Sequence, residues 1–383
     1  MPVTIRTLLA QKSNEIRLLE AHDNVSTELI RGTVNDSGKG FDGAWISGLT
    51  QTTYLGIPDT EMISPLKRAT MLTFNGDGVR KGARPLCAAF DADSGGDLVD
   101  IPALVSVLAL HGVSMVIIED KALSAPGQKV NSLLATSDAQ GQADPHAFAE
   151  VLRTFREAAS GTDLMVTARI ESFTSRVVRQ DAAEERQSVA NALQDALTRA
   201  AIYTAAGAHA IMIHSKSKQP DEVLAFLEGF RARDTSTPLV VVPTAYASTP
   251  RAVLRDAGAD IFIYANHLMR AKIQAVGRVS DSLLAAKEGL FAQDDSEDLR
   301  VAAAARNFGC LLRKLTERDN AGVEEEEAAM LYRRIMSKLA AETMGAVVKR
   351  LAHGELSGCE ADDLIIPVKD LLTINARQVS QIS

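Results

Sequence analysis

Residues 86–120, LCAAFDADSGGDLVDIPALVSVLALHGVSMVIIED, carry the clearest structural pattern in the chain. Two short apolar runs, 86–91 and 115–120, enclose a helical pattern at 102–112 that ends in Gly112. Neither run alternates apolar with polar residues, which is typical of strands buried on both faces of a parallel sheet. A glycine at the end of a helix commonly adopts the left-handed conformation. The stretch therefore predicts one strand–helix–strand unit.

The same alternation continues along the chain, with helical patterns at 220–233 and 249–258 and closing glycines at Gly207 and Gly258. The apolar runs are IRLLEA (16–21), GAWIS (43–47), LCAAFD (86–91), MVIIED (115–120), MVTARIE (165–171), AIMIHS (210–215), LVVVPT (239–244) and IFIYAN (261–266). Eight such units predict an α/β fold, a (β/α)₈ TIM-type barrel over residues 1–287. A doubly wound open sheet is the alternative. It usually carries a glycine-rich turn after its first strand, where this chain has His22-Asp23-Asn24.

The remainder of the chain has a different pattern. Residues 288–361 predict an additional helical region, inserted before a C-terminal segment at 362–383. Its amphipathic helices at 301–315 and 326–351 need a hydrophobic partner. We expect that partner to be another subunit.

Composition excludes several classes of protein. The 383 residues contain 41 basic and 49 acidic side chains, a net charge of −8, so no basic field favours nucleic acid. No run of about 18 apolar residues predicts a membrane span, and the N-terminus lacks the apolar core of a signal peptide. The cysteines, Cys87, Cys310 and Cys359, lie far apart, which fits a reducing cytoplasm rather than a disulfide framework. Cys87 lies in a strand, where we expect a small core residue.

Polar side chains follow several of the predicted strands where each strand ends. Asp91 and Asp93 end one run, Glu119 ends the next, and Arg169 and His214 end two others. In a barrel, catalytic residues project from the carboxyl ends of the strands. Carboxylates at neighbouring ends can share a hard cation such as Mg²⁺. Charged loop starts joined by salt bridges are the alternative interpretation.

The order of these motifs resembles the phosphoenolpyruvate mutase and phosphonopyruvate hydrolase branch of the isocitrate lyase superfamily. The matching stretches are EAHDNVS (20–26), WISGLT (45–50), LGIPD (55–59), DADSG (91–95), EDK (119–121), KVNS (129–132), RIESF (169–173), GAHAIMIHSK (207–216), VVVPTAY (240–246), YANHLMRA (264–271) and IIPVKDLL (365–372). The stretches up to residue 271 run in order across residues 16–272, about two thirds of the chain, and the stretch at 365–372 resembles the family's last helix region. Jointly the stretches are specific.

The resemblance implies a barrel whose eighth helix packs on a neighbouring subunit, in a homodimer or homotetramer. It implies Mg²⁺ held by Asp91, Asp93 and Glu119, partly through water, and a small-molecule substrate. The implied catalytic residues are Asp59, Lys129, Asn131, Arg169 and His214. The implied substrate-binding residues are Trp45, Ser47, Gly48, Leu49 and Ser132. The segments around Asp59 and 129–132 would close over the substrate.

The segment 121–132, KALSAPGQKVNS, indicates which enzymes of the superfamily the chain resembles most. Lyases of this superfamily carry a cysteine and a histidine here, and this chain has neither. Asn131-Ser132 resembles the mutases, whereas the hydrolases typically have Thr-Ser. We therefore expect a mutase that interconverts phosphoenolpyruvate and phosphonopyruvate through a loose, metaphosphate-like transition state, as in phosphonate biosynthesis. A phosphonopyruvate hydrolase is the alternative.

Two departures from the family pattern leave the substrate open. Nine residues separate Lys121 from Asn131, more than in the family pattern, and DADSGGDL (91–98) lacks the family's aromatic residue. A lengthened lid is compatible with a mutase-like enzyme that acts on a substituted phosphoenolpyruvate or a related oxyanion. A barrel with an idle site, whose helical region serves assembly, is a further alternative.

Overall fold

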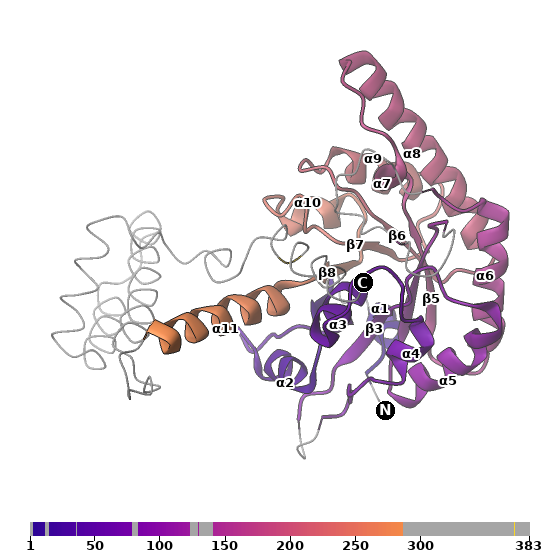
Figure 1. Cartoon of the computed structure of the whole chain (residues 1–383). Helices are drawn as coiled ribbons and strands as arrows, with labels where there is room; N and C mark the ends of the chain where they lie inside the picture. The colour runs from indigo at the N-terminus through magenta and orange to yellow at the C-terminus, as the bar shows by residue number, and fades with distance from the viewer. Residues whose placement is uncertain are drawn as a thin grey trace. The chain divides into compact units, whose positions relative to one another are not determined.

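The predicted strands form a closed parallel barrel in the computed structural model of the protein, which describes residues 3–11, 15–35, 37–78, 83–122, 129, 141–285 and 371. Strand order follows chain order, and β8 pairs with β1 to close the sheet, with Leu18 opposite Ile263. Figure 1 shows the strands in the middle of the barrel, with β6, β7 and β8 following one another around it. The strands are β1 (Ile16–Glu20), β2 (Gly43–Ile46), β3 (Cys87–Asp91), β4 (Met115–Glu119), β5 (Met165–Ile170), β6 (Ala210–Ile213), β7 (Leu239–Val241) and β8 (Ile261–Tyr264). The (β/α)₈ barrel is confirmed, and the open sheet is excluded.

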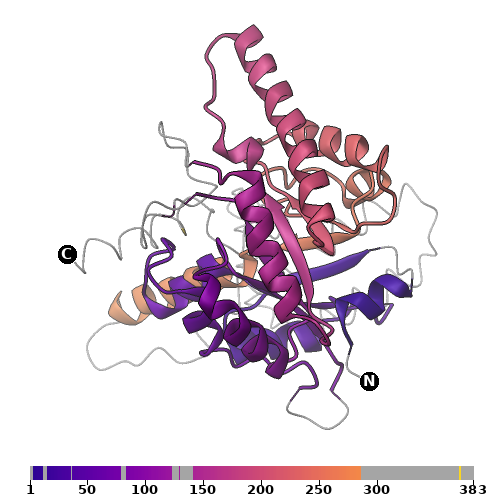
Figure 2. The same ribbon diagram turned by 90° about the vertical axis from the view of Figure 1, so that its right-hand side faces the viewer.

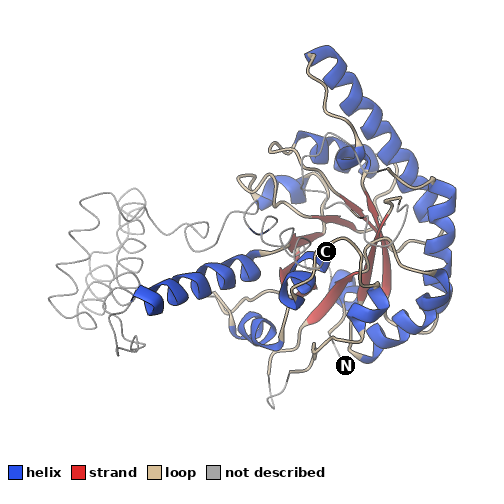
Figure 3. Ribbon diagram, viewed as in Figure 1, coloured by secondary structure: helices blue, strands red, loops and turns tan. Residues whose placement is uncertain are grey.

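The strands are buried on both faces, which explains their lack of polar alternation. In β4, Met115 and Ile117 belong to a cluster inside the barrel, whereas Val116 and Ile118 pack in a second cluster with the surrounding helices. Cys87 is fully buried inside the barrel, as expected for a small core residue. Figure 3 shows the strands at the centre of the barrel with helices around them.

Helices precede, connect or follow the strands. They are α1 (Ile5–Ala10), α2 (Asn24–Gly32), α3 (Gly48–Leu55), α4 (Pro65–Ala69), α5 (Ile101–Leu110), α6 (Pro145–Ala158), α7 (Ser172–Ser175), α8 (Ala182–Ala205), α9 (Asp221–Arg231), α10 (Arg251–Asp256) and α11 (His267–Ala285), with a 3₁₀ turn at Leu98–Asp100. Of these helices, α2, α6 and α8 are among those that pack against the sheet. Gly112 and Gly258 follow α5 and α10 with φ of +71° and +112°, so both close a helix as predicted. Figure 2 shows α8 beside α6 and extending past it. No helix among these described elements is long and apolar enough to span a membrane.

The chain forms two compact units, residues 1–269 with 368–383 and residues 270–367. The barrel and the site described below belong to the first unit. The predicted helical region at 288–361 and, apart from Leu371, the segment 362–383 lie outside the described residues. Their structure and the predicted exchange of a helix between subunits therefore stay predictions.

Candidate active site

A cavity lies at the carboxyl ends of the barrel strands, where parallel strands bring together the residues that follow them. Its walls come from seven of the eight strand ends, from α3 and from the segments that carry Asp59 and Lys129. The lining residues are Trp45, Ser47, Leu49, Asp59, Asp91, Glu119, Lys121, Lys129, Arg169, Met212, His214, Val242, Thr244, Ala265 and Asn266. The cavity therefore combines apolar side chains with several charged groups.

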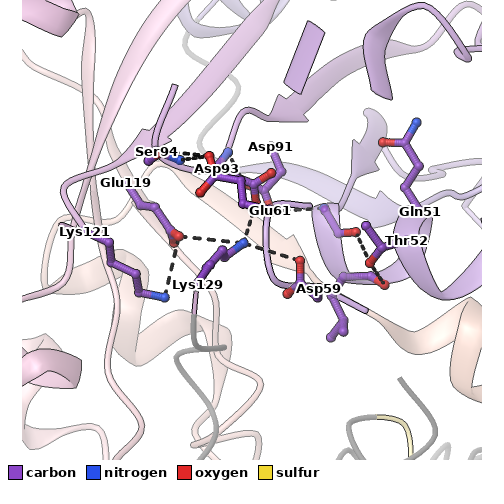
Figure 4. A network of polar contacts seen from close by, with 12 residues as sticks. Gln51, Thr52, Asp59, Glu61, Asp91, Asp93, Ser94, Glu119, Lys121 and Lys129 are labelled. Carbon is purple, nitrogen blue, oxygen red and sulfur yellow. Dashed lines mark hydrogen bonds and ion pairs between the residues drawn. The ribbon is translucent and has the colours of Figure 1, made fainter. Parts of the chain in front are cut away.

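Lys129 lies among the carboxylates of this cavity (Figure 4). Its ammonium group binds Asp93 and lies 3.4 Å from Asp59 Oδ1 and 3.7 Å from Glu119 Oε1. Its backbone N–H donates to the Thr60 carbonyl at 3.3 Å. Burial disfavours the charge, but Asp59 and Asp93 outweigh burial and hold the pKa of Lys129 well above its ordinary value. Lys129 is therefore a fixed cation at the acidic side of the cavity.

Arg169 and His214 form a second group of donors. The Arg169 guanidinium lies 2.5 Å from Glu171 Oε1 and 3.2 Å from Glu119 Oε2, and it donates to His214 Nδ1 at 3.1 Å. The same Nδ1 lies 3.5 Å from Glu171 Oε1, so it accepts from Arg169 when the neutral ring carries its proton on Nε2 and donates to Glu171 when Nδ1 is protonated. Burial and the charge of Arg169 lower the pKa of His214, which keeps the imidazole neutral near pH 7. Together the two side chains offer donors to an oxyanion.

The turn between β2 and α3 contacts the acidic turn that follows β3, in the same cavity. The Gly48 N–H donates to Asp91 Oδ2 at 3.0 Å, so in this structure it binds a carboxylate, whereas Trp45, Ser47 and Leu49 line the cavity. A Cβ atom on Gly48 would lie 3.0 Å from Asp93 Oδ1, closer than most Cβ contacts, so a larger residue would require the Asp93 carboxylate to shift. Burial and the charge of Asp93 raise the pKa of Asp91.

Sequence reasoning missed several polar residues of the site. Arg68, from α4, is fully buried and pairs with Asp93 at 2.5 Å. Glu61 accepts hydrogen bonds from the N–H and hydroxyl of Ser94, and burial together with Asp93 raises the pKa of Glu61 to about 7. Asn266, which is 1% exposed, lines the cavity with its Oδ1 lacking a hydrogen-bond partner. Only Asn266 stands at a strand end, the one pattern that could have indicated it.

The charges of the site leave a negative excess. Four fixed cations are Arg68, Lys121, Lys129 and Arg169. They face six carboxyl groups, those of Asp59, Glu61, Asp91, Asp93, Glu119 and Glu171. The excess is two negative charges when all six are ionised, the charge that one divalent cation would balance. Burial is the main cause of the raised pKa of Glu61, and the charge of Asp93 adds to it.

The donor set fits Mg²⁺, although no ready-made cage is present. Among the described residues, no three histidine, cysteine or acidic side chains are arranged to hold a metal ion by themselves, and Lys129 lies between Asp93 and Glu119. Both Glu119 oxygens are buried and form ion pairs with Lys121, Lys129 and Arg169 but accept no hydrogen bond of standard geometry, so a cation or water could share them. Carboxylate oxygens with water are the ligands that Mg²⁺ prefers.

The structure brings together the predicted site residues that it describes. Around one cavity lie Trp45, Ser47, Gly48, Leu49, Asp59, Asp91, Asp93, Glu119, Lys129, Arg169 and His214. Asn131 and Ser132 lie outside the described residues. The roles assigned to all these residues remain predictions.

The fold and the charged cavity define a (β/α)₈ barrel that carries a polar site at the carboxyl ends of its strands. A sequence model of the family described as phosphoenolpyruvate phosphomutase matches residues 5–284. The chain therefore belongs to the phosphoenolpyruvate mutase family.

Proteins similar to this chain include one named for each of the two activities of this branch. A phosphoenolpyruvate phosphomutase of Tetrahymena pyriformis is 30% identical over 69% of this chain and 77% of its own. A phosphonopyruvate hydrolase of Variovorax sp. (strain Pal2) is 30% identical over 63% of this chain and 74% of its own. Identity alone does not separate the two activities.

Two solved structures resemble the fold. A phosphoenolpyruvate phosphomutase from Streptomyces platensis subsp. rosaceus aligns with a TM-score of 0.60 and 30% identity, over 74% of this chain and 88% of that one. A phosphonopyruvate hydrolase in complex with oxalate and Mg²⁺ aligns with a TM-score of 0.57 and 25% identity, over 76% and 90%.

Proposed function

We propose that the protein is a phosphoenolpyruvate mutase, which moves a phosphoryl group between the enol oxygen of phosphoenolpyruvate and C3 of pyruvate. The observation that carries the proposal is the convergence of Lys129, Arg169 and the neutral His214 on one cavity with an acidic wall. The segment 121–132 contains no cysteine, whereas the lyases of the superfamily carry one there, so the sequence disfavours a lyase. Family membership and the Asn131-Ser132 pair support the mutase.

The chemistry explains the need for these donors. Phosphoryl transfer passes through a loose transition state whose charge is spread over the phosphoryl oxygens. Fixed donors stabilise such a state without reorganising during the reaction. Arg169 and His214 Nε2–H would bind the substrate oxyanions, and Lys129 would neutralise a phosphoryl oxygen from the opposite side. Asp59, which lies 3.4 Å from Lys129, would hold the lysine there.

Mg²⁺ is the cofactor that we propose for this site. Asp91 and Glu119 would hold the ion, with Asp93 contributing through water. The bound ion would supply a fixed positive charge for the carboxylate and phosphoryl oxygens of the substrate. The chain's own task is to exclude water, because water would capture the phosphoryl group.

Phosphonopyruvate hydrolase is the second candidate, since the Variovorax relative and the Tetrahymena mutase are both 30% identical to the chain over the residues that they match. The same donors would bind phosphonopyruvate, and water would enter to receive the phosphoryl group. We further propose a homodimer or homotetramer in the cytoplasm. Light scattering at micromolar protein concentration tests this assembly, and the mass of a monomer would contradict it.

A ³¹P NMR time course tests the proposed reaction. Purified protein is incubated with Mg²⁺ and phosphonopyruvate, and an Arg169→Met variant prepared in parallel controls for contaminating enzymes. We expect the phosphonate signal to convert into that of phosphoenolpyruvate with the wild type alone. Inorganic phosphate with pyruvate would instead establish the hydrolase. An unchanged phosphonate signal would contradict both and point to a substituted substrate.

A further inference from the structure

Arg68 is a buried cation directly behind the acidic turn of the site. Its side chain is fully buried, and the guanidinium lies 5.0 Å from the ring centroid of Phe90. It donates to Asp93 Oδ2 and to the Asp91 carbonyl, both at 2.5 Å, and to Gln51 Oε1 at 2.9 Å. Four described groups therefore fix one guanidinium. Arg68 does not line the cavity, so it acts on the site through Asp93.

The contact of Arg68 with Asp93 determines the conformation of Asp93 and which of its carboxylate oxygens faces Lys129. Asp93 has a φ of +49°, a left-handed conformation that costs a non-glycine residue of the order of 1 kcal/mol or more. Arg68 holds both the carboxylate of this residue and the carbonyl two residues earlier, so it stabilises the turn in that conformation. Because Arg68 occupies Oδ2, Asp93 presents Oδ1 to Lys129.

We propose that Arg68 is a positioning residue that fixes Asp93 as the anchor of Lys129 and sets the charge of the cation site. The chain of contacts runs from Arg68 through Asp93 to Lys129, and each carboxylate oxygen of Asp93 binds one cation. Asp93 is thereby an anchor for the lysine more than a ligand for the metal. This inference concerns the same site as the proposed mutase but does not depend on which reaction the site performs.

A purely structural arginine and a positioning arginine differ in one measurable respect. Removing the charge of Arg68 increases the negative excess around Asp91, Asp93 and Glu119, so a divalent cation should bind more tightly. The same change releases Asp93 and Lys129 from their positions, so turnover should fall. Tighter metal binding combined with slower turnover is therefore the pattern that positioning predicts. Loss of packing alone would weaken both or leave both unchanged.

The experiment uses the full-length protein and two readouts. Mn²⁺ affinity is measured by electron paramagnetic resonance in the absence of substrate, and kcat and KM are measured with phosphonopyruvate and Mg²⁺. Arg68→Met removes the charge. Arg68→Lys keeps it. Arg31→Met is the matched control, because Arg31 is also a buried arginine, whose guanidinium contacts Glu28 and the carbonyl of Asn75.

Gln51→Leu is a second variant in case Arg68→Met does not fold. Gln51 exchanges two hydrogen bonds with Arg68, at 2.9 and 3.0 Å, and does not line the cavity. The substitution loosens the guanidinium without removing its charge. We expect kcat to fall about tenfold, a loss of about 1.4 kcal/mol in transition-state stabilisation, with Mn²⁺ affinity within threefold of the wild type.

The expected and contradicting results are distinct. We expect Arg68→Met to bind Mn²⁺ about tenfold more tightly and to lose at least about a hundredfold in kcat with a smaller change in KM. Arg68→Lys should keep Mn²⁺ affinity within threefold, and Arg31→Met should keep both quantities. Folded Arg68→Met with unchanged or weaker Mn²⁺ binding, or Gln51→Leu with unchanged kcat, would overturn the proposal. A wild type inactive on phosphonopyruvate would refute the proposed function alone, because the Mn²⁺ comparison still decides the role of Arg68.

Discussion

Replacing Lys129 with methionine should lower the stability of the metal-free protein and strengthen the binding of a divalent cation. The ammonium of Lys129 binds Asp93 and lies 3.4 Å from Asp59, a spacing at which unit charges attract by ~5 kcal/mol at an effective dielectric constant of about 20. Most of this attraction offsets the desolvation of the buried groups. Removing one partner of such a pair leaves uncompensated buried charge and typically costs about 3–5 kcal/mol. We therefore expect Lys129→Met to destabilise the metal-free protein by about 3 kcal/mol.

Divalent cations should reverse most of this loss. Because the variant has one more uncompensated negative charge, Mn²⁺ should bind it more tightly than the wild type, and millimolar Mn²⁺ should restore most of its thermal midpoint. Turnover of phosphonopyruvate should nevertheless fall at least about a hundredfold, about 3 kcal/mol of transition-state stabilisation. Thermal melts with and without Mn²⁺, together with kcat, measure these effects.

A matched lysine serves as the control for this prediction. Lys216 is half-buried and donates to the Thr174 carbonyl at 3.2 Å, and it does not line the cavity. Lys216→Met should change the stability by less than about 1 kcal/mol and kcat by less than threefold. Equal stability losses in the two variants, or a loss in Lys129→Met that Mn²⁺ does not reverse, would refute the electrostatic account of Lys129.

Three further predictions concern the neighbouring residues. The folded-state pKa of Glu61 is about 7, above its ordinary value of 4.5, so ionisation opposes folding and the penalty grows as pH rises from about 4.5 through 7. Glu61→Gln should therefore be more stable than the metal-free wild type at pH 8, by up to about 3 kcal/mol, and equal to it at pH 4; equal melting temperatures at both pH values would contradict this. Gly48→Ala would place a Cβ atom 3.0 Å from Asp93 Oδ1, so Mn²⁺ affinity and kcat should each fall about tenfold or more, and unchanged titrations would show that the turn can yield. Tyr203 donates to the buried carboxylate of Asp120 at 2.7 Å, so Tyr203→Phe should lower the free energy of unfolding by about 1–2 kcal/mol while kcat stays within threefold; a larger loss of kcat would place this network in the mechanism.

The barrel could be predicted from the sequence because each buried parallel strand leaves a contiguous apolar run. The run 115–120 became β4, for example, and the helical pattern at 102–112 became α5. The meeting of the strand-end residues could also be predicted, because a closed parallel barrel places the carboxyl ends of all its strands at one rim. Asp91, Glu119 and His214 do meet there.

Arg68 and Glu61 could not be predicted, because they reach the site from a short helix and a turn. Lys67-Arg68 near the end of α4 has the pattern of exposed basic residues at a helix C-terminus, and only the folded chain shows that Arg68 is buried against Asp93. Glu61 has a φ of +60°, which no local pattern indicates. The contacts that set the charge of the site are long-range, so sequence spacing does not reveal them.

The most direct test of the proposed mutase reaction is to determine whether oxygen from water becomes bound to phosphorus during turnover. Phosphonopyruvate is converted in ¹⁸O-labelled water with Mg²⁺, and ³¹P NMR isotope shifts report the label on phosphorus. If the charged cavity excludes water and keeps the phosphoryl group within one molecule, phosphoenolpyruvate forms with its non-bridging phosphoryl oxygens unlabelled. Inorganic phosphate that carries ¹⁸O would show that water receives the phosphoryl group, which would contradict the mutase and establish the hydrolase.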